Sequence, residues 1–339
     1  MMKPHMMKNA MPQSPSQSPP QSPSQATSQT TPPPELPGVP LVESPFFEAA
    51  IEQHDFSNFE RQIACDLHDK GYAIFDFPDP SFDQRAEALI NALTKKFDIE
   101  GWKKTGWKTK EGLRFQDGWD RHENIRSIAA NPEVLRLLSR IYGREAFAFQ
   151  TLNFPVGTQQ NPHSDAVHFS TMPERFMVGV WVAMEDIGPD QGPLVYYPGS
   201  HKWPVLYNQM IDPAYRPDPE ASETERYRHY INFWRAMVET HGIEPEYFHA
   251  KKGQALIWSS NILHGGSPHK DPEKTRWSQV THYYFKGCVY YVPRMSDPAV
   301  GRLHLKTPLD IATGKRVENI FIDTPLKDIQ AISRHASKL

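Results

Sequence analysis

Cysteine is nearly absent from this chain of 339 residues. The two cysteines, Cys65 and Cys288, form no close-spaced motif, which argues against a disulfide framework and favours a reducing, cytoplasmic environment. The sequence also lacks any apolar run approaching the roughly 20 residues that a membrane helix needs. Its first ten residues hold no apolar core of the kind found in secretory signals. We therefore expect a soluble protein with no membrane partner.

An excess of charge of one sign is missing as well. Lys and Arg total 37, and Asp and Glu total 40. This near balance provides no electrostatic footprint for nucleic acid or for an anionic membrane. The composition therefore indicates neither a nucleic-acid partner nor a membrane partner, and the oligomeric state cannot be deduced from it.

The beginning of the chain differs in composition from the rest. Residues 11–40 are dominated by Pro, Ser, Gln and Thr. Such a segment cannot bury enough apolar surface to offset the entropy lost on ordering. We therefore predict a disordered tail over residues 1–43 and a single folded domain over residues 44–339.

Within the predicted domain, helical patterns precede strand patterns. Amphipathic helices are expected at residues 59–70, 81–97 and 132–142. Short β-rich runs then follow, several of them separated by Gly or Pro turns, at residues 147–154, 163–169, 176–183, 194–197, 255–259 and 280–285. This pattern favours an antiparallel sandwich or barrel. An insert at about residues 204–249 contains a helical stretch and is either a substrate-contacting lid or a decoration of the fold.

The segment Asn161-Pro162-His163-Ser164-Asp165 holds the first candidate metal ligands. On an extended backbone, the i, i+2 spacing of His163 and Asp165 points both side chains to the same side of a sheet. Two histidines and one carboxylate on one face of an octahedron, with open positions opposite, are typical of non-haem Fe(II) oxygenases. A bare His-x-Asp occurs by chance in many proteins, so the surrounding sequence decides its meaning.

The third ligand must come from a later strand, and His264 is the candidate. It follows an apolar run and precedes two glycines, which allow a ligand and its backbone to approach a metal closely. The competing ligands are His168, His201 and His282. His168 is three residues after Asp165, so a strand would turn it away from the metal. Each of these histidines, taken alone, is better explained as a hydrogen-bonded core residue.

Arg276 lies twelve positions after His264 and begins the segment Arg276-Trp277-Ser278, at the start of the next expected strand. A guanidinium one strand away from the metal could bind a carboxylate through two hydrogen bonds, with the Ser278 hydroxyl as an extra donor. This geometry is needed to hold the far carboxylate of 2-oxoglutarate while its keto-acid end chelates iron. Taken alone, Arg276 would be an ordinary surface arginine.

Several stretches together carry a resemblance to a known family. They are Pro162-His163-Ser164-Asp165, Trp181-Val182-Ala183-Met184-Glu185-Asp186, Gly192-Pro193-Leu194 running to Pro198-Gly199-Ser200-His201, Leu263-His264-Gly265-Gly266-Ser267 and Arg276-Trp277-Ser278. Through them the chain resembles the phytanoyl-CoA dioxygenase family of Fe(II)/2-oxoglutarate oxygenases, over about residues 146–286. The resemblance implies a mainly β fold with flanking helices, a double-stranded β-helix of the jelly-roll, cupin-like kind. It also implies His163, Asp165 and His264 as iron ligands and Arg276 as the 2-oxoglutarate anchor.

The same resemblance suggests further cosubstrate contacts. It indicates that Trp181 borders 2-oxoglutarate and that Thr151 and Arg114 reach it, although Trp181 fits a barrel core and Arg114 a loop salt bridge equally well. The implied reaction uses Fe(II), 2-oxoglutarate and O2 to hydroxylate a small metabolite, with release of succinate and CO2. Related halogenases have a small residue in place of the carboxylate ligand, so the intact Asp165 favours hydroxylation.

Two alternatives stay open at this point. One is a cupin-type metal-binding barrel with isomerase or hydrolase activity, which has no use for Arg276 and Ser278. The other is a non-catalytic barrel, which predicts no stoichiometric Fe(II) binding and no succinate. The substrate itself cannot be deduced, since nothing in the sequence selects an acyl-CoA.

Overall fold

The structure is a computed structural model and describes residues 36–105, 113–212 and 223–327. These residues all fall in one unit, residues 33–339. The predicted tail lies outside the described residues as far as residue 35. Packed structure begins before the predicted boundary at residue 44, because Val42 in the turn η1 (Leu41–Glu43) is fully buried in the main hydrophobic core.

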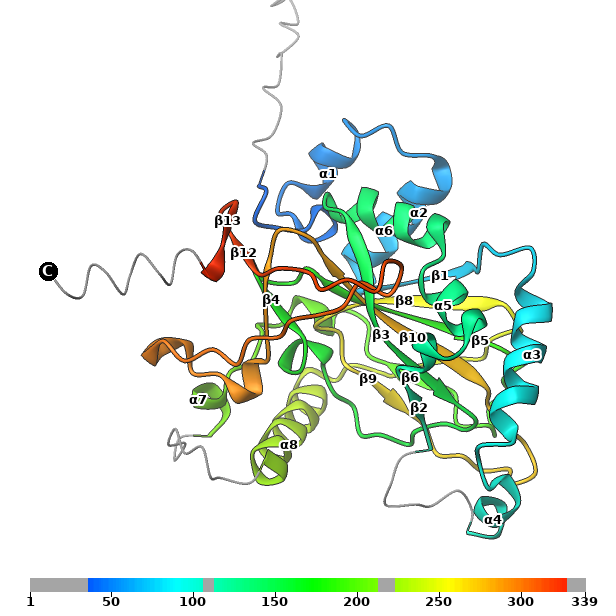
Figure 1. The fold of residues 1–339 in the computed structure, drawn as a ribbon. Coiled ribbons are helices and arrows are strands. Elements are labelled where there is room, and N and C mark those ends of the chain that lie inside the picture. The colour runs from blue at the N-terminus through cyan, green and yellow to red at the C-terminus, as the bar shows by residue number, and fades with distance from the viewer. Residues whose placement is uncertain (1–35, 106–112, 213–222, 328–339) are drawn as a thin grey trace, which may run out of the picture. The chain divides into compact units, whose positions relative to one another are not determined.

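Two antiparallel sheets form the centre of the fold (Figure 1). The larger has the strand order β1 (Tyr72–Asp76), β8 (Gln254–Ser259), β5 (Met177–Ala183), β10 (Ser278–Phe285), β3 (Ala146–Phe154), β2 (Phe115–Gln116). The smaller has the order β7 (Glu246–Phe248), β6 (Leu194–Tyr196), β9 (His264–Gly266). The mainly β fold with flanking helices, a double-stranded β-helix, is thus confirmed.

Alternation along the strands of the larger sheet supplies two separate cores. In β8, Ala255 and Ile257 belong to the main core, which also contains buried residues of the helices. Leu256 and Trp258 belong to a second core, shared with Leu194 of the smaller sheet. Successive side chains of a strand point to opposite faces, so one face of the sheet meets the helices and the other faces the smaller sheet. The candidate ligands lie on this second side.

Helices cover the first face, and Figure 1 shows several of them gathered beside the larger sheet. Their bounds are α1 (Phe47–Ile51), α2 (Asn58–Lys70), α3 (Phe82–Thr94), α4 (Ile99–Lys104), α5 (Glu123–Ala129) and α6 (Pro132–Tyr142). Ser57 and Glu60 form a capping box at the start of α2. Asn131 caps α6, and Pro132 is the first residue of that helix. These local signals explain why α2 and α6 begin within a residue of the sequence prediction.

The insert packs against the strands rather than standing apart. It contains α7 (Asn208–Ile211), α8 (Glu223–His241) and strand β7 of the smaller sheet, while residues 213–222 lie outside the described residues. Tyr230 and Trp234 of α8 are buried and form a third hydrophobic cluster with Val167, Leu206 and Leu263. The helix is therefore packed against the chain just after Asp165, at Val167, and just before His264, at Leu263.

The remaining elements are short. The paired strands are β4 (Ser170–Met172) with β11 (Val289–Tyr291) and β12 (Ile320–Phe321) with β13 (Thr324–Pro325), and the further 3-10 turns are η2 (Gly118–Asp120), η3 (Asp165–Val167), η4 (Ser200–Lys202), η5 (Pro293–Met295) and η6 (Pro298–Val300). Within the described ranges, no helix combines the length and the apolar character needed to cross a membrane.

Candidate metal and cosubstrate site

The two candidate histidine ligands are brought together by their own backbones. His163 donates its N–H to the carbonyl of His264 at 2.9 Å, and His264 donates to the carbonyl of His163 at 3.0 Å. Residues directly opposite one another on antiparallel strands project to the same side. The imidazole ring centres accordingly lie 4.6 Å apart. Two positions about a hundred residues apart in sequence thus form a single pair of side chains.

Asp165 joins this pair because Ser164 is extended and the chain then turns. Ser164 has φ −106° and ψ 132°, and its hydroxyl accepts the N–H of Ala166 at the start of η3. The Ser164 hydroxyl also lies 3.2 Å from the carbonyl of Ser260, to which it donates. The i, i+2 spacing therefore places the Asp165 carboxylate beside the histidines as expected. The strand predicted for residues 163–169 is wrong, because this 3-10 turn interrupts it.

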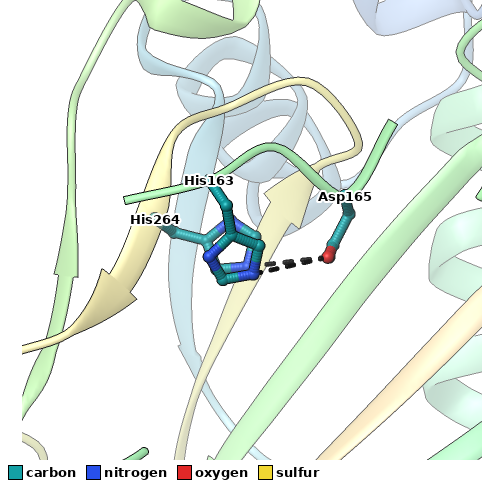
Figure 2. A group of neighbouring side chains, drawn as sticks. All are labelled: His163, Asp165 and His264. Carbon is teal, nitrogen blue, oxygen red and sulfur yellow. Dashed lines mark ion pairs between the residues drawn. The ribbon is translucent and has the colours of Figure 1, made fainter. Parts of the chain in front are cut away.

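The three candidate ligands converge on one point (Figure 2). Their ligand atoms all lie within 4.8 Å of one another, and all three residues are buried. Nε2 of His163 is 3.9 Å from Asp165 Oδ1, and Nε2 of His264 is 3.6 Å from Asp165 Oδ2. This is the group that the sequence predicted.

The hydrogen bonds of the two imidazoles show what the group can hold. Nδ1 of His163 lies 3.0 Å from the carbonyl oxygen of Asn161, and Nδ1 of His264 lies 3.2 Å from that of Ile262. A carbonyl only accepts, so each Nδ1 carries a proton, which leaves Nε2 of each ring as the atom that can offer a lone pair to a metal. Two lone pairs and a carboxylate that face one another repel unless a cation lies among them. The donor set of two imidazoles and one carboxylate suits Fe(II).

Burial tunes this group toward the protonation states that bind a metal. Burial lowers the pKa of His264 to about 4, against the opposing pull of the Asp165 carboxylate. Burial also opposes ionisation of Asp165, but His264, His282 and His163 outweigh it and hold the pKa of this carboxyl well below its ordinary value. At neutral pH the group therefore offers a neutral His264 and an ionised Asp165.

Two further side chains contact Asp165: Trp258, which the sequence analysis did not single out, and His282, which it named only as a competing ligand. Trp258 donates its indole N–H to Asp165 Oδ2 at 2.8 Å. Nε2 of His282 lies 3.5 Å from the same oxygen, and its Nδ1 lies 3.0 Å from Gln150 Oε1. The alternation of β8 was the available signal for Trp258, because it places this residue on the face opposite Ile257. His282, a competing ligand in the sequence, lies beside the group of three rather than within it.

The other competing histidines lie elsewhere. His168 lines the same cavity as the candidate ligands, contrary to the expectation from a strand. A 3-10 turn has three residues per turn, so the residue at i+3 from Asp165 returns to the same side. Its Nδ1 accepts a hydrogen bond from Arg294 Nε at 2.9 Å, and burial lowers its pKa to about 3. His201 instead bonds the carbonyl of His68 through Nε2 at 3.0 Å, so this competing ligand is held away from the candidate metal group.

The candidate ligands open into a cavity of about 330 Å³. One part of its lining holds Trp181 and Arg276, the predicted cosubstrate residues. Phe169 and Tyr227 also line it, and the ring centres of Tyr227 and His168 are 5.1 Å apart. Tyr227 belongs to α8, so the insert contributes directly to the cavity wall.

Arg276 is buried inside this cavity rather than on the surface. Its guanidinium carbon lies 5.3 Å from the centre of the Trp181 ring, and its Nη1 donates to the Ser278 hydroxyl at 3.2 Å. Burial lowers the pKa of Arg276 to about 10, so the group stays charged at neutral pH. Arg276 Nε and Trp181 Nε1 are both buried without a hydrogen-bond partner in the described part of the chain. These two unpartnered N–H donors, one of which belongs to the cationic guanidinium itself, fit an incoming carboxylate.

Glu185 holds the residues on both sides of Arg276. Its carboxylate accepts the hydroxyl of Thr275 at 2.9 Å and the N–H of Trp277 at 2.5 Å. Burial raises the pKa of Glu185, although these hydrogen bonds and Arg276 oppose the shift. The segment that presents the guanidinium is thereby tied to the end of β5.

Of the two remaining predicted contacts, the structure supports only one as a cavity residue. Thr151 is wrong: it lies between Gln150 and Leu152 on β3, both of which line the cavity, so strand alternation turns Thr151 to the opposite face. Arg114 does line the cavity, with an exposed side chain. The residues just before it, 106–112, lie outside the described part of the chain.

The part of the chain that holds this site matches a known protein family. Residues 67–276, more than half of the chain, match the family model described as phytanoyl-CoA dioxygenase (PhyH). The chain belongs to the phytanoyl-CoA dioxygenase family. It is 24% identical over 196 residues to the peroxisomal phytanoyl-CoA dioxygenase of Rattus norvegicus, covering 55% of this chain and 54% of that protein. It is also 34% identical over 96 residues to phytanoyl-CoA dioxygenase domain-containing protein 1 of Mus musculus, covering 26% of this chain and 32% of that protein.

The chain thus spans about half the length of the rat protein.

Among solved structures, it is similar to the non-haem α-ketoglutarate-dependent carbocyclase SnoK of nogalamycin biosynthesis, with 18% identity and a TM-score of 0.51 over 75% of this chain and 94% of that one. It is also similar to EctD of S. alaskensis with 2-oxoglutarate and 5-hydroxyectoine, with 17% identity and a TM-score of 0.47 over 68% and 76%. Fe(II) and 2-oxoglutarate are the metal and cosubstrate of the family, and the buried group of two histidines and one aspartate fits the iron.

Proposed function

We propose that this protein is an Fe(II)- and 2-oxoglutarate-dependent dioxygenase that hydroxylates a small-molecule substrate, with release of succinate and CO2. One observation carries the proposal. A buried, charged guanidinium with an unpartnered Nε shares a cavity with two imidazole lone pairs and a carboxylate. The guanidinium suits a carboxylate, and the two imidazoles with the Asp165 carboxylate suit Fe(II). Because they share one cavity, they suit a dicarboxylate that binds the guanidinium at one end and the metal at the other.

The roles of the residues follow from these contacts. His163, Asp165 and His264 hold Fe(II), which supplies the redox chemistry that activates O2 and oxidises 2-oxoglutarate. Arg276 binds the far carboxylate of 2-oxoglutarate, and the Trp181 indole N–H is a second donor to it. Ser278 accepts a hydrogen bond from Arg276 and so fixes the direction of its guanidinium.

The chain also controls what else enters the cavity. Trp181, Trp258 and Leu194 place apolar surface around the inner part, which excludes water from the reacting atoms. Tyr227 and Phe169 offer aromatic faces to a substrate. The Asp165 carboxylate occupies the ligand position that a halide would need, which supports hydroxylation over halogenation.

The same observations argue against the two alternatives left open by the sequence. A cupin-type isomerase or hydrolase needs the metal group but gives no reason to bury Arg276 in the same cavity. A non-catalytic barrel gives no reason to face two imidazole lone pairs toward a buried carboxylate, since each such group costs desolvation without a partner.

Succinate release provides the test. The protein should be purified anaerobically, loaded with Fe(II) and supplied with 2-oxoglutarate, O2 and a panel of metabolites, and succinate should form above a slow basal rate with the true substrate. Asp165→Ala should abolish the Fe(II)-dependent reaction. Asp83→Ala, which removes an exposed carboxylate on α3, should leave it unchanged. A folded Asp165→Ala enzyme with full activity would refute the ligand assignment.

A further inference from the structure

Trp258 lies against the candidate metal group without being a ligand. Its side chain is 2% exposed, and its indole N–H donates to Asp165 Oδ2 at 2.8 Å. The same indole ring lies 4.8 Å from the His264 ring, centre to centre, at an interplanar angle of 39°. One side chain therefore contacts two of the three candidate ligands.

We propose that Trp258 is a positioning residue that sets the orientation of the Asp165 carboxylate, so that Asp165 binds the metal through Oδ1 alone. This inference rests on the function proposed above. A carboxylate can rotate about its Cβ–Cγ bond and can bind a metal through one oxygen or both. A hydrogen bond of normal length to Oδ2 stops this rotation and occupies a lone pair of that oxygen. Both oxygens lie near a ligand nitrogen, Oδ1 at 3.9 Å from His163 Nε2 and Oδ2 at 3.6 Å from His264 Nε2. Only Oδ2 accepts the indole N–H, so Oδ1 is the oxygen left for the metal.

The position of the indole depends on Gly179 of β5. Gly179 pairs directly with Trp258 of β8 on one side and with His282 of β10 on the other. A Cβ built on Gly179 would lie 2.2 Å from Cε2 and 2.3 Å from Cζ2 of the indole. The indole therefore crosses β5 at a point where any other residue would collide with it.

The backbone of Gly179 gives no other reason for a glycine. It lies in the middle of a strand, and it is not among the glycines of the described residues that have positive φ. Glycine in a strand interior weakens the strand and marks a close approach of another group. Here the approaching group is the Trp258 side chain, which holds Asp165, so Gly179 also contributes to the orientation of the Asp165 carboxylate.

Keeping Asp165 bound through one oxygen has a consequence for the metal. Carboxylate binding through both oxygens would occupy a coordination position that 2-oxoglutarate or O2 needs. Outer partners of metal ligands typically change metal affinity by about 10- to 100-fold when they are removed. We therefore expect the loss of the indole N–H to change both the affinity of the site and the coordination number of the bound ion.

Co(II) titration of the metal-free protein tests the role of the N–H. Co(II) reports affinity through its dissociation constant and coordination number through its visible absorption, and neither requires turnover. Trp258→Phe keeps an aromatic ring and removes the N–H, so the dissociation constant should rise about 10-fold or more with a changed spectrum. Trp119→Phe, outside the cavity lining, should match the wild type. A folded Trp258→Phe protein with wild-type affinity and spectrum overturns the inference.

The variant Gly179→Ala, alone and combined with Trp258→Phe, tests whether Gly179 makes the space that the indole needs. Alone, it should raise the Co(II) dissociation constant and change the spectrum as Trp258→Phe does, because the added methyl displaces the indole. In the double variant, the affinity should fall no further than in Trp258→Phe, since the hydrogen bond is already lost. Wild-type affinity in folded Gly179→Ala, or fully additive losses, overturns the role of Gly179. Failure of the wild type to bind Co(II), or undiminished binding by Asp165→Ala, refutes the proposed function instead.

Discussion

Arg276 offers the sharpest separation between cosubstrate binding and metal binding. Replacement by methionine keeps the length of the side chain and removes the charge and all five N–H donors. The lost partner of a buried, charge-assisted carboxylate contact typically costs 2–5 kcal/mol, and a value of about 3 kcal/mol corresponds to roughly a 100-fold change in binding. We therefore expect the KM for 2-oxoglutarate to rise about 100-fold.

The assay is succinate formation at fixed Fe(II) over a wide range of 2-oxoglutarate concentrations. Arg276→Lys keeps the charge but loses the forked geometry, so its KM should lie between those of the wild type and Arg276→Met. Arg121→Met is the control, because this side chain is 59% exposed and lies outside the cavity lining. Co(II) affinity should be the same in all four proteins. An unchanged KM in folded Arg276→Met would show that another group holds the far carboxylate.

Three further predictions concern stability. Gly71→Ala should lower the free energy of unfolding, measured by urea titration, more than Gly143→Ala does. Both glycines have left-handed φ, +85° and +76°, but only at Gly71 would an added Cβ lie 2.5 Å from His201 Nδ1. Burial lowers the pKa of His201 to about 4, so between its ordinary value near 6.5 and 4 the unfolded chain binds a proton that the folded protein excludes. Stability should therefore fall by up to about 3 kcal/mol as the pH drops through this window, and His201→Gln should remove this part of the pH dependence. Trp234→Ala should cost about 3–5 kcal/mol and speed proteolytic cleavage within residues 204–249, measured against Trp119→Ala.

Strand alternation and helix caps made much of the fold predictable. The run from Ala255 to Ser259 alternates between two buried faces, and it forms β8 one residue longer than predicted. Asn131 with Pro132 marked the start of α6 because both residues act locally, through a side-chain acceptor and a fixed φ. The spacing of His163 and Asp165 was likewise a local property of an extended Ser164.

The errors arose where a side chain's direction depended on more than its own strand. His168 reached the cavity because Ser164 and Ser260 stabilise a 3-10 turn, and the distant Ser260 carbonyl cannot be seen in the local sequence. Thr151 failed by a single position, since a shift of one residue exchanges the two faces of a strand. Trp258 was overlooked because its role comes from a neighbour on another strand, Gly179, whose missing side chain makes the space.

The insert shows why the site depends on segments that are distant in sequence. The backbone bridge between His163 and His264 holds the ligands together only if both of their segments stay in register. Val167, two residues after Asp165, and Leu263, next to His264, both pack against the buried cluster of α8. The helix therefore contacts the chain beside each ligand segment while it also presents Tyr227 to the cavity. A change in how α8 packs would act on ligand geometry and on the substrate wall together, which makes the insert part of the site rather than a decoration of the fold.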